Sequence, residues 1–205
     1  MSNMNLFASA APDPVPLPLP DATVVYCSRF FSEEESVVYY DILKRETPWK
    51  QDDIKVFGKN YKQPRLTALY GQTKKTYSYS GITMHPATFT ETLEEIYNKI
   101  SLFSEEKFNT VLLNLYRDGQ DSNGWHSDDE KELGDDPIIA SVSFGVPRVF
   151  HFRNKKNHTL KHKMVLENGS LLLMKQGTQI HWQHQLPKSK KVEGQRINLT
   201  FRNIL

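Results

Sequence analysis

The last regular segment of the chain, residues 196–202, alternates strictly between apolar and polar side chains. Ile197, Leu199 and Phe201 form one set, and Arg196, Asn198, Thr200 and Arg202 form the other. Side chains on an extended strand point alternately to its two faces, so this period predicts a β-strand with one apolar and one polar face. The polar face either turns to water, as on an ordinary half-buried strand, or lines a polar site.

The rest of the pattern predicts two helices followed by a series of strands. Ser32-Glu33-Glu34-Glu35 is a capping-box pattern that opens a helix running to about Lys44. Phe89, Leu93, Ile96 and Ile100 follow helical spacing, which predicts a second helix over about 87–103. Strands are expected around 109–116, 138–144, 148–153, 161–166, 170–174, 179–184 and 195–202, with a hairpin turn at Asn168-Gly169. This order predicts a mainly β (α+β) fold, a sandwich or jelly roll with supporting helices on one face.

Composition indicates one domain behind a short leader. Prolines stand at alternate positions from Pro12 to Pro20, which excludes a regular helix or a central strand there, so residues 1–21 are expected to form a flexible leader. Residues 22–205 have the size of a single domain with one well-filled core. No apolar run approaches the length of a membrane span.

Cysteine content and charge narrow the class further. Cys27 is the only cysteine, so no internal disulfide forms and a reducing, intracellular compartment is expected. The formal net charge is only +2, so overall charge gives little support for a nucleic-acid partner and local clusters must supply it. We expect a monomer.

A second pattern predicts a metal site. His126 and Asp128 are two residues apart, so on an extended segment both could reach one ion while Ser127 points away. Two imidazoles and one carboxylate are the protein ligands of many non-haem Fe(II) centres. Spacing leaves His181 and His184 as equal candidates for the third ligand. Many His-x-Asp triplets are chance surface features, and the same set would suit zinc, but a zinc hydrolase would give Arg196 and Arg202 no task.

Several collinear motifs resemble one family. They are Val56-Phe57-Gly58-Lys59, Pro64-Arg65, Tyr77-Ser78-Tyr79-Ser80-Gly81, Asn114-Leu115-Tyr116, His126-Ser127-Asp128-Asp129-Glu130, Ala140-Ser141-Val142-Ser143-Phe144-Gly145, His181-Trp182-Gln183-His184-Gln185-Leu186-Pro187, and Arg196 to Arg202. From about Ile54 to Leu205 the chain resembles the AlkB family of Fe(II)/2-oxoglutarate-dependent nucleic-acid dealkylases. The match is closest to the second AlkB homologue, which repairs double-stranded DNA.

The resemblance implies a fold and a set of cofactor ligands. The fold would be a double-stranded β-helix (jelly roll) core over 109–205, preceded by a nucleotide-recognition lid over 50–85. Fe(II) would be held by His126, Asp128 and His184, which would act with O₂ and the cosubstrate 2-oxoglutarate. The cosubstrate contacts would be Asn114, Tyr116, Arg196, Asn198, Thr200 and Arg202. Arginine suits such a site, because a guanidinium forms bidentate hydrogen bonds with a carboxylate.

The resemblance also implies an activity, oxidative demethylation of 1-methyladenine and 3-methylcytosine with release of formaldehyde. The damaged base would be flipped out of duplex DNA, stacked on Tyr79, bonded near Tyr77 and read at its charged edge by Asp129, beside Glu130. Val56, Phe57 and Gly58 resemble the apolar finger that fills the gap left in the duplex. Arg65 and lysines at 55, 59, 62, 155, 156, 161, 163, 188, 190 and 191 would contact phosphates. The alternative is a demethylase of single-stranded DNA or RNA. The location would be the cytoplasm of a bacterium or the nucleus of a eukaryote.

Overall fold

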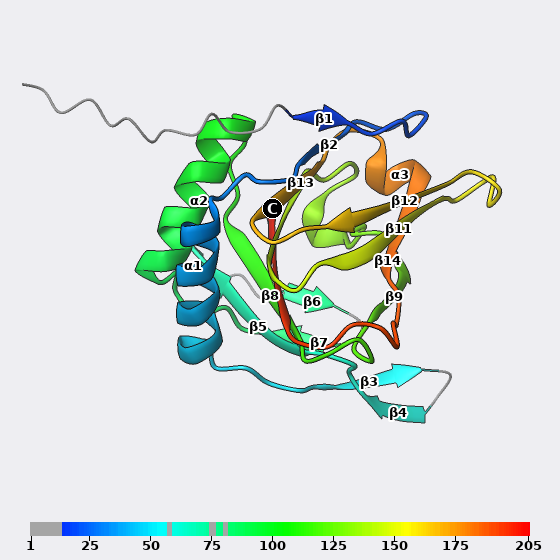
Figure 1. Cartoon of the computed structure of the whole chain (residues 1–205). Coiled ribbons are helices and arrows are strands. Elements are labelled where there is room, and N and C mark those ends of the chain that lie inside the picture. Colours follow the sequence, from blue (N-terminus) through cyan, green and yellow to red (C-terminus); the bar gives the residue numbers. More distant parts are fainter. Residues whose placement is uncertain (1–13, 57–58, 74–76, 80–81) are drawn as a thin grey trace, which may run out of the picture.

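Two antiparallel sheets pack face to face and form the body of the protein (Figure 1). The computed structural model describes residues 14–56, 59–73, 77–79 and 82–205. The larger sheet has the order β1 (Val15–Pro16), β2 (Val24–Cys27), β13 (Ser170–Met174), β10 (Ile139–Gly145), β15 (Arg196–Arg202), β8 (Thr110–Tyr116) and β5 (Leu66–Gly71). The smaller sheet has the order β12 (Lys161–Leu166), β11 (Arg148–Asn154), β14 (Trp182–Leu186) and β9 (Asn123–His126). This architecture confirms the jelly-roll prediction.

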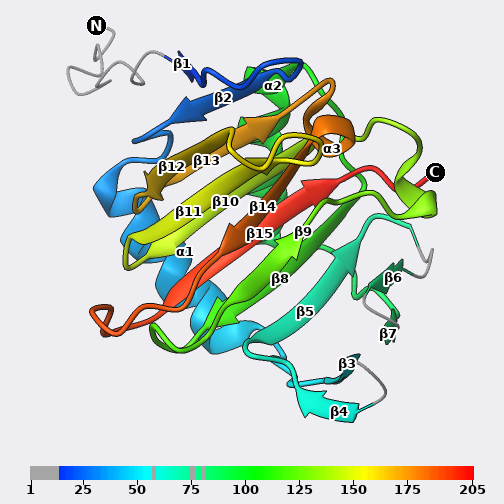
Figure 2. The same ribbon diagram turned by 90° about the vertical axis from the view of Figure 1, so that its right-hand side faces the viewer.

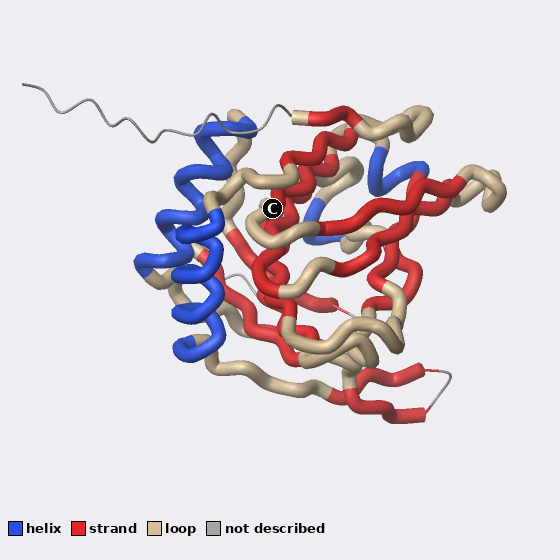
Figure 3. Tube along the Cα trace, viewed as in Figure 1, coloured by secondary structure: helices blue, strands red, loops and turns tan. Residues whose placement is uncertain are grey.

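Two long helices cover the outer face of the larger sheet, and Figure 3 shows both on the same side of the strands. α1 (Glu33–Glu46) begins at the predicted capping box: the Ser32 hydroxyl accepts from the Glu35 N–H at 3.1 Å, and the Glu35 carboxylate accepts from the Ser32 N–H at 2.7 Å. α2 (Glu91–Ser104) begins at Thr90, whose side chain accepts from the Leu93 N–H. Shorter helical turns are η1 (Lys131–Leu133) and α3 (Thr178–His181). Among the described helices, none has the length and apolar character needed to cross a membrane.

The alternation of β15 separates two apolar layers. Ile197, Leu199 and Phe201 are fully buried in the core between the larger sheet and the helices. The polar residues of the same strand point between the two sheets, and they are buried as well. Since all seven residues are buried, the reading in which the polar face turns to water is wrong. Polar groups in that position need partners or a ligand.

Two further predictions were wrong in their local detail. Residues 178–181 form α3 instead of the first part of a strand, and β14 starts only at Trp182. Gly169 has the left-handed backbone expected of a turn, with φ of 71°. However, β12 belongs to the smaller sheet and β13 to the larger, so this turn carries the chain from one sheet to the other and closes no hairpin.

Part of the segment predicted to be a flexible leader packs against the body of the protein. β1 is an edge strand paired with β2, Leu19 is only 4% exposed, and the Trp182 indole N–H donates to the Pro20 carbonyl at 2.9 Å. An edge strand tolerates proline because one of its sides needs no ladder bonds. Within the range 50–85, β5 joins the larger sheet. The rest of that range contributes two small hairpins, β3 (Asp53–Val56) with β4 (Lys59–Lys62) and β6 (Tyr77–Tyr79) with β7 (Ile82–Met84), which lie near the β5 edge (Figure 2).

Ile96→Ala should lower the free energy of unfolding by about 2–5 kcal/mol, because Ile96 is fully buried in the helix-side core and its loss leaves a cavity. Urea denaturation measures the change. Leu102→Ala on the same helix is the matched control, since Leu102 is 86% exposed and its truncation should cost no more than about 0.5 kcal/mol. Equal losses for the two variants would contradict this placement of α2.

Candidate functional site

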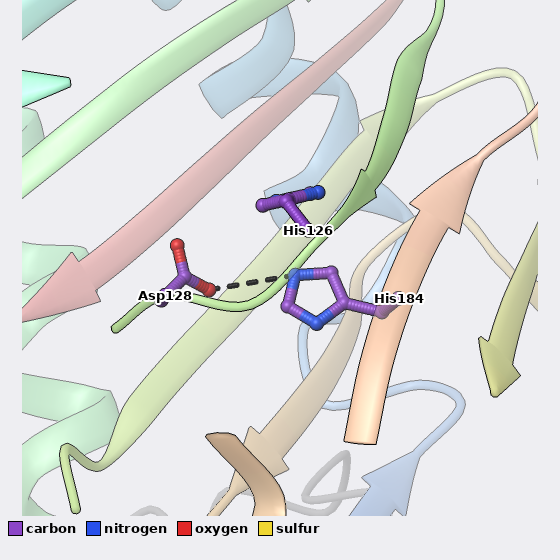
Figure 4. Close-up of side chains that lie close together, drawn as sticks. All are labelled: His126, Asp128 and His184. Carbon is purple, nitrogen blue, oxygen red and sulfur yellow. Dashed lines mark ion pairs between the residues drawn. The ribbon is translucent and has the colours of Figure 1, made fainter. Parts of the chain in front are cut away.

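Three predicted ligands meet between the two sheets. The ligand atoms of His126, Asp128 and His184 all lie within 4.8 Å of one another (Figure 4). His126 ends β9 and pairs in register with His184 on β14, and their ring centroids are 4.3 Å apart. The His184 Nε2 lies 3.4 Å from the Asp128 Oδ2. The structure resolves the choice left open by spacing, because His181 ends α3 and is not part of this group.

Asp128 lies beyond the end of β9, so side-chain contacts outside the sheet ladder fix its position. Its backbone N–H donates to the Gln179 Oε1 at 3.0 Å. The Ser127 hydroxyl points away from the metal group, as predicted, and donates to the Trp182 carbonyl at 3.0 Å. These two bonds tie the ligand segment to α3 and to the start of β14. Gln179 gave no signal in the sequence, because its role arises from the α3 turn.

Electrostatics keep two of the three ligands, Asp128 and His126, in the protonation states that a divalent metal requires. Burial alone would raise the pKa of the Asp128 carboxyl group, but Arg202 and His184 hold that pKa well below its ordinary value. The Arg202 Nη2 lies 3.0 Å from the Asp128 Oδ1. Burial, with the neighbouring charge of His184, lowers the pKa of His126 to about 3. An ionised Asp128 carboxylate and a neutral His126 imidazole are therefore present at neutral pH.

The histidine tautomers also fit a metal. The His126 Nδ1 lies 2.8 Å from the Gly124 carbonyl oxygen, which places the ring proton there and leaves the lone pair on Nε2. The His184 Nδ1 is buried and has no hydrogen-bond partner within the described residues. With the two imidazoles and one carboxylate of the donor set, this arrangement fits Fe(II).

A polar pocket continues from the metal group along β15 and β8. The strand register places Arg196 opposite Tyr116 and Asn198 opposite Asn114. All six residues predicted to contact the cosubstrate line this pocket together with the three metal ligands. Its full lining is Arg65, Leu112, Asn114, Tyr116, Asn123, His126, Asp128, Ser141, Phe150, Met174, His184, Leu186, Arg196, Asn198, Thr200 and Arg202.

The two arginines of β15 mark opposite ends of the pocket. They are six residues apart, which corresponds to about 20 Å between their Cα atoms on a strand. Arg202 is paired with the metal ligand Asp128. Arg196 lies at the far end, where it donates to the Ser143 hydroxyl at 2.9 Å and lies 5.4 Å from the centre of the Tyr116 ring. Burial lowers its pKa to about 10, and it forms no ion pair with any described carboxylate.

Arg65, which was predicted to contact phosphates at the surface, lies buried in the pocket lining instead. Its side chain is buried, its Nε donates to the Asn114 Oδ1 at 2.8 Å, and its Nη1 donates to the Asn123 Oδ1 at 3.2 Å. Arg65 therefore orients the predicted cosubstrate contact Asn114 from inside the pocket. Asn123 and Ser141 also line the pocket, and Ser143 holds Arg196 through the hydrogen bond given above. The sequence predicted no role for these three residues.

The remaining predicted substrate contacts are only partly described. Asp129 is exposed next to the metal ligand, with its Oδ2 3.1 Å from the Lys155 Nζ, and Glu130 beside it is half-buried. Phe57 and Gly58 lie outside the described residues, and so do the side chains of Val56, Tyr77 and Tyr79. Their predicted roles stay predictions.

Comparisons with known proteins agree with this site. Residues 23–202 match the 2OG-Fe(II) oxygenase superfamily. The DNA oxidative demethylase ALKBH2 of Bos taurus is 46% identical over 160 residues, which are 74% of this chain and 57% of the relative. The alpha-ketoglutarate-dependent dioxygenase alkB homolog 3 of Bos taurus is 41% identical over 195 residues, which are 88% of this chain and 66% of the relative.

The chain spans 57% and 66% of the lengths of these two relatives. A solved structure titled "The structure of OsALKBH1" has a TM-score of 0.62 at 16% identity and covers 88% of this chain and 97% of that chain, which is a likeness of fold. The family match extends over every strand of the two sheets except β1 and over all three ligands of the metal group. The chain therefore belongs to the 2OG-Fe(II) oxygenase superfamily and, with these relatives, to its AlkB group.

Proposed function

We propose that this protein is an Fe(II)/2-oxoglutarate-dependent dioxygenase that removes N-methyl groups from DNA bases by oxidation. The observation that carries the cofactor assignment is a single pocket with the three-ligand metal group at one end and the buried cation Arg196 at the other. The DNA substrate rests on relatives that are named DNA oxidative demethylase and on the motifs shared with them.

Each end of the pocket would hold one end of 2-oxoglutarate. Its C1 carboxylate and keto oxygen would lie at the metal group, where His126, Asp128 and His184 would hold Fe(II). Its distal carboxylate would meet Arg196, since a buried guanidinium without a carboxylate partner is the group that such an anion stabilises. Arg202 would keep Asp128 ionised and correctly oriented, because the two side chains are paired. Tyr116 and Asn114 would provide further polar contacts.

Bound at His126, Asp128 and His184, Fe(II) would supply the oxidative chemistry: one atom of O₂ would end in the succinate formed with CO₂ from 2-oxoglutarate, and the other in the N-methyl group as a hydroxyl. The N-hydroxymethyl group would then break at its C–N bond and release formaldehyde and the unmodified base. The protein's own contribution is to hold the cosubstrate, to keep the carboxylate and imidazoles in ligating form, and to position the methyl group.

The lesion itself would be read next to the metal. 1-Methyladenine and 3-methylcytosine are cations, and Asp129 offers a carboxylate directly after the ligand Asp128. Asp129 is paired with Lys155, so a cationic base would exchange with the lysine as the partner of this carboxylate. Glu130 lies beside it, and Tyr77 and Tyr79 would contact the flipped base. Val56, Phe57 and Gly58 would fill the gap in a duplex.

The natural substrate would be duplex DNA, and the protein would act as a monomer. It would be located in the compartment that holds the genome of the host. That is the nucleus in a eukaryote and the cytoplasm in a bacterium. A single cysteine, Cys27, is compatible with a reducing compartment.

Asp128→Asn should abolish succinate formation and weaken the binding of Co(II), used as a spectroscopic substitute for Fe(II), because the site loses its only anionic ligand. Titration of the cobalt absorption bands measures this affinity. Asp129→Asn is the matched control: its side chain is 62% exposed and outside the metal group, so metal affinity should not change. Normal cobalt binding by Asp128→Asn would overturn the metal assignment.

Arg196→Met should raise the KM for 2-oxoglutarate by roughly 10–100-fold while metal binding is retained, because the distal carboxylate loses a charged hydrogen-bond partner. The measurement is succinate formation at varied cosubstrate concentration. Arg117→Met, which removes an arginine paired with Asp121 outside the pocket lining, should leave this KM unchanged. If both variants keep the wild-type KM, Arg196 does not hold the cosubstrate.

Phe57→Ala should reduce kcat/KM for 1-methyladenine in duplex DNA far more than for the same lesion in a single strand. The side chain would replace the flipped base in the stack, and unstacking costs a few kcal/mol only where a duplex stack exists. Mass measurement of the base gives both rates. Phe103→Ala on α2 is the control and should change the two rates equally. An equal loss on both substrates for Phe57→Ala would favour the single-strand alternative or a core role.

A further inference from the structure

The smaller sheet has an outward face that the pocket chemistry does not use. Burial alternates along its strands, so that every second residue points away from the pocket. We call these residues the outer face, and they are Trp125, Val149, His151, Arg153, Lys161, Lys163, Val165, Gln183 and Gln185. It bears three permanent cations and a histidine, and no aspartate or glutamate is among its members.

An aromatic ring and an arginine are stacked on this face, on the side where β9 lies. The Arg153 guanidinium lies 4.3 Å from the centre of the Trp125 ring, and its Nη2 donates to the Gln183 Oε1 at 2.8 Å. The ring of His151 lies 6.4 Å from that of Trp125 with an angle of 32° between their planes. These contacts fix the orientation of a large ring that would otherwise be free to rotate.

The cations continue across the sheet in two rows. The strand register places Lys163, His151 and Gln185 side by side, and Lys161, Arg153 and Gln183 form the next row. Neighbouring strands are about 4.8 Å apart, so each row brings positive charge and amide groups within roughly 10 Å of each other. Phosphate groups bind to such cations, and amides, arginine planes and aromatic rings bind to bases.

The outer face is continuous with the pocket through one strand. β9 is the edge strand of the smaller sheet, and its consecutive residues Trp125 and His126 point to opposite faces. A polymer that delivers one unit to the metal group can therefore pass around the β9 edge and lie on the outer face. Two other roles for this face leave the stacked Trp125 ring unexplained. A face that only contacts water needs no such ring, and a face that binds an acidic protein needs only the cations.

We propose that the outer face is a second nucleic-acid contact, which binds the strand adjoining the base in the pocket by stacking on Trp125 and by phosphate contacts with Lys161 and Lys163. Lys161 and Lys163 on β12 thereby bind the same strand of nucleic acid as Trp125 on β9, instead of only contacting water. The contact extends beyond the demethylation proposed above, and unmethylated strands should bind it as well.

The test uses the full chain with Fe(II) in the absence of O₂ and an unmethylated single strand of about fifteen nucleotides. Binding is followed by fluorescence anisotropy of the labelled strand and by quenching of tryptophan emission. Trp125→Ala should weaken binding on the order of ten-fold, the effect of one lost base stack. Trp125→Phe should keep the affinity and lose the quenching, because Phe still stacks, Trp182 is only 2% exposed, and Trp49 packs against the helix-side core, away from the outer face.

The charge contribution is tested separately with Lys161→Glu/Lys163→Glu. The slope of log Kd against log salt should fall by about 1.4, since each phosphate contact on a single strand contributes about 0.7. Lys44→Glu/Lys107→Glu is the matched control, because it makes the same change in net charge at exposed positions on and after the helices on the other side of the larger sheet. That variant should retain the wild-type slope.

A trinucleotide that carries 1-methyladenine reaches only the pocket, so its demethylation should not change in any outer-face variant. If demethylation is absent while the binding differences are present, the proposed function fails and the outer face stands. Equal weakening by the two charge variants, or an unchanged affinity for Trp125→Ala, would overturn the proposal. Tight binding of polyglutamate that competes with the strand and leaves the tryptophan emission unquenched would instead assign the face to an acidic protein.

Discussion

Buried positive charge is the constraint on which the rest of the site depends. Among the described residues, four arginines are buried, Arg65, Arg148, Arg196 and Arg202, against two aspartates, Asp121 and Asp128. Burial of a charge without an opposite charge costs several kcal/mol per ion, so Arg196, which forms no ion pair with any described carboxylate, is stabilised by an anionic ligand. The distal carboxylate of 2-oxoglutarate would supply this negative charge. The same imbalance keeps Asp128 ionised, because Arg202 is its direct partner.

Strand β15 of the larger sheet positions the buried cations relative to the metal group. Arg202 and Arg196 belong to one strand, so the distance between the metal end and the distal end of the pocket is set by the backbone of β15 and by its register with β8. A slip of one residue would turn Ile197, Leu199 and Phe201 into the pocket and the arginines into the helix-side core. The apolar layer beneath α1 and α2 thus specifies the position of Arg196 and Arg202, although Ile197, Leu199 and Phe201 do not line the pocket.

Much of this arrangement follows from periodicity. The alternation in residues 196–202 predicted both faces of β15, and the spacing of His126 and Asp128 predicted that they share one ion. Periodicity could not decide whether the polar face of β15 contacts solvent. That depends on the smaller sheet, whose strands β11 and β14 come from other parts of the chain and cover this face. Periodicity also could not separate His181 from His184, since the α3 turn that moves His181 away is only four residues long. Burial of Arg65 depends on its contact with Asn114, 49 residues away in sequence.

The smaller sheet is irregular where β14 pairs with β9, although these two strands position the metal ligands His184 and His126. Pairing of β14 with β9 shifts register between His184 and Leu186, next to two metal ligands. The buried Arg148 spans this point: its guanidinium donates to the carbonyls of Asp118 and Asp121, which precede β9, and of Pro187, which follows β14. These three bonds join the segments that flank the two strands and so help to fix the strands relative to each other. Because Trp125 and His126 lie on opposite faces of β9, the same clamp determines which side chain meets the metal and which lies on the outer face.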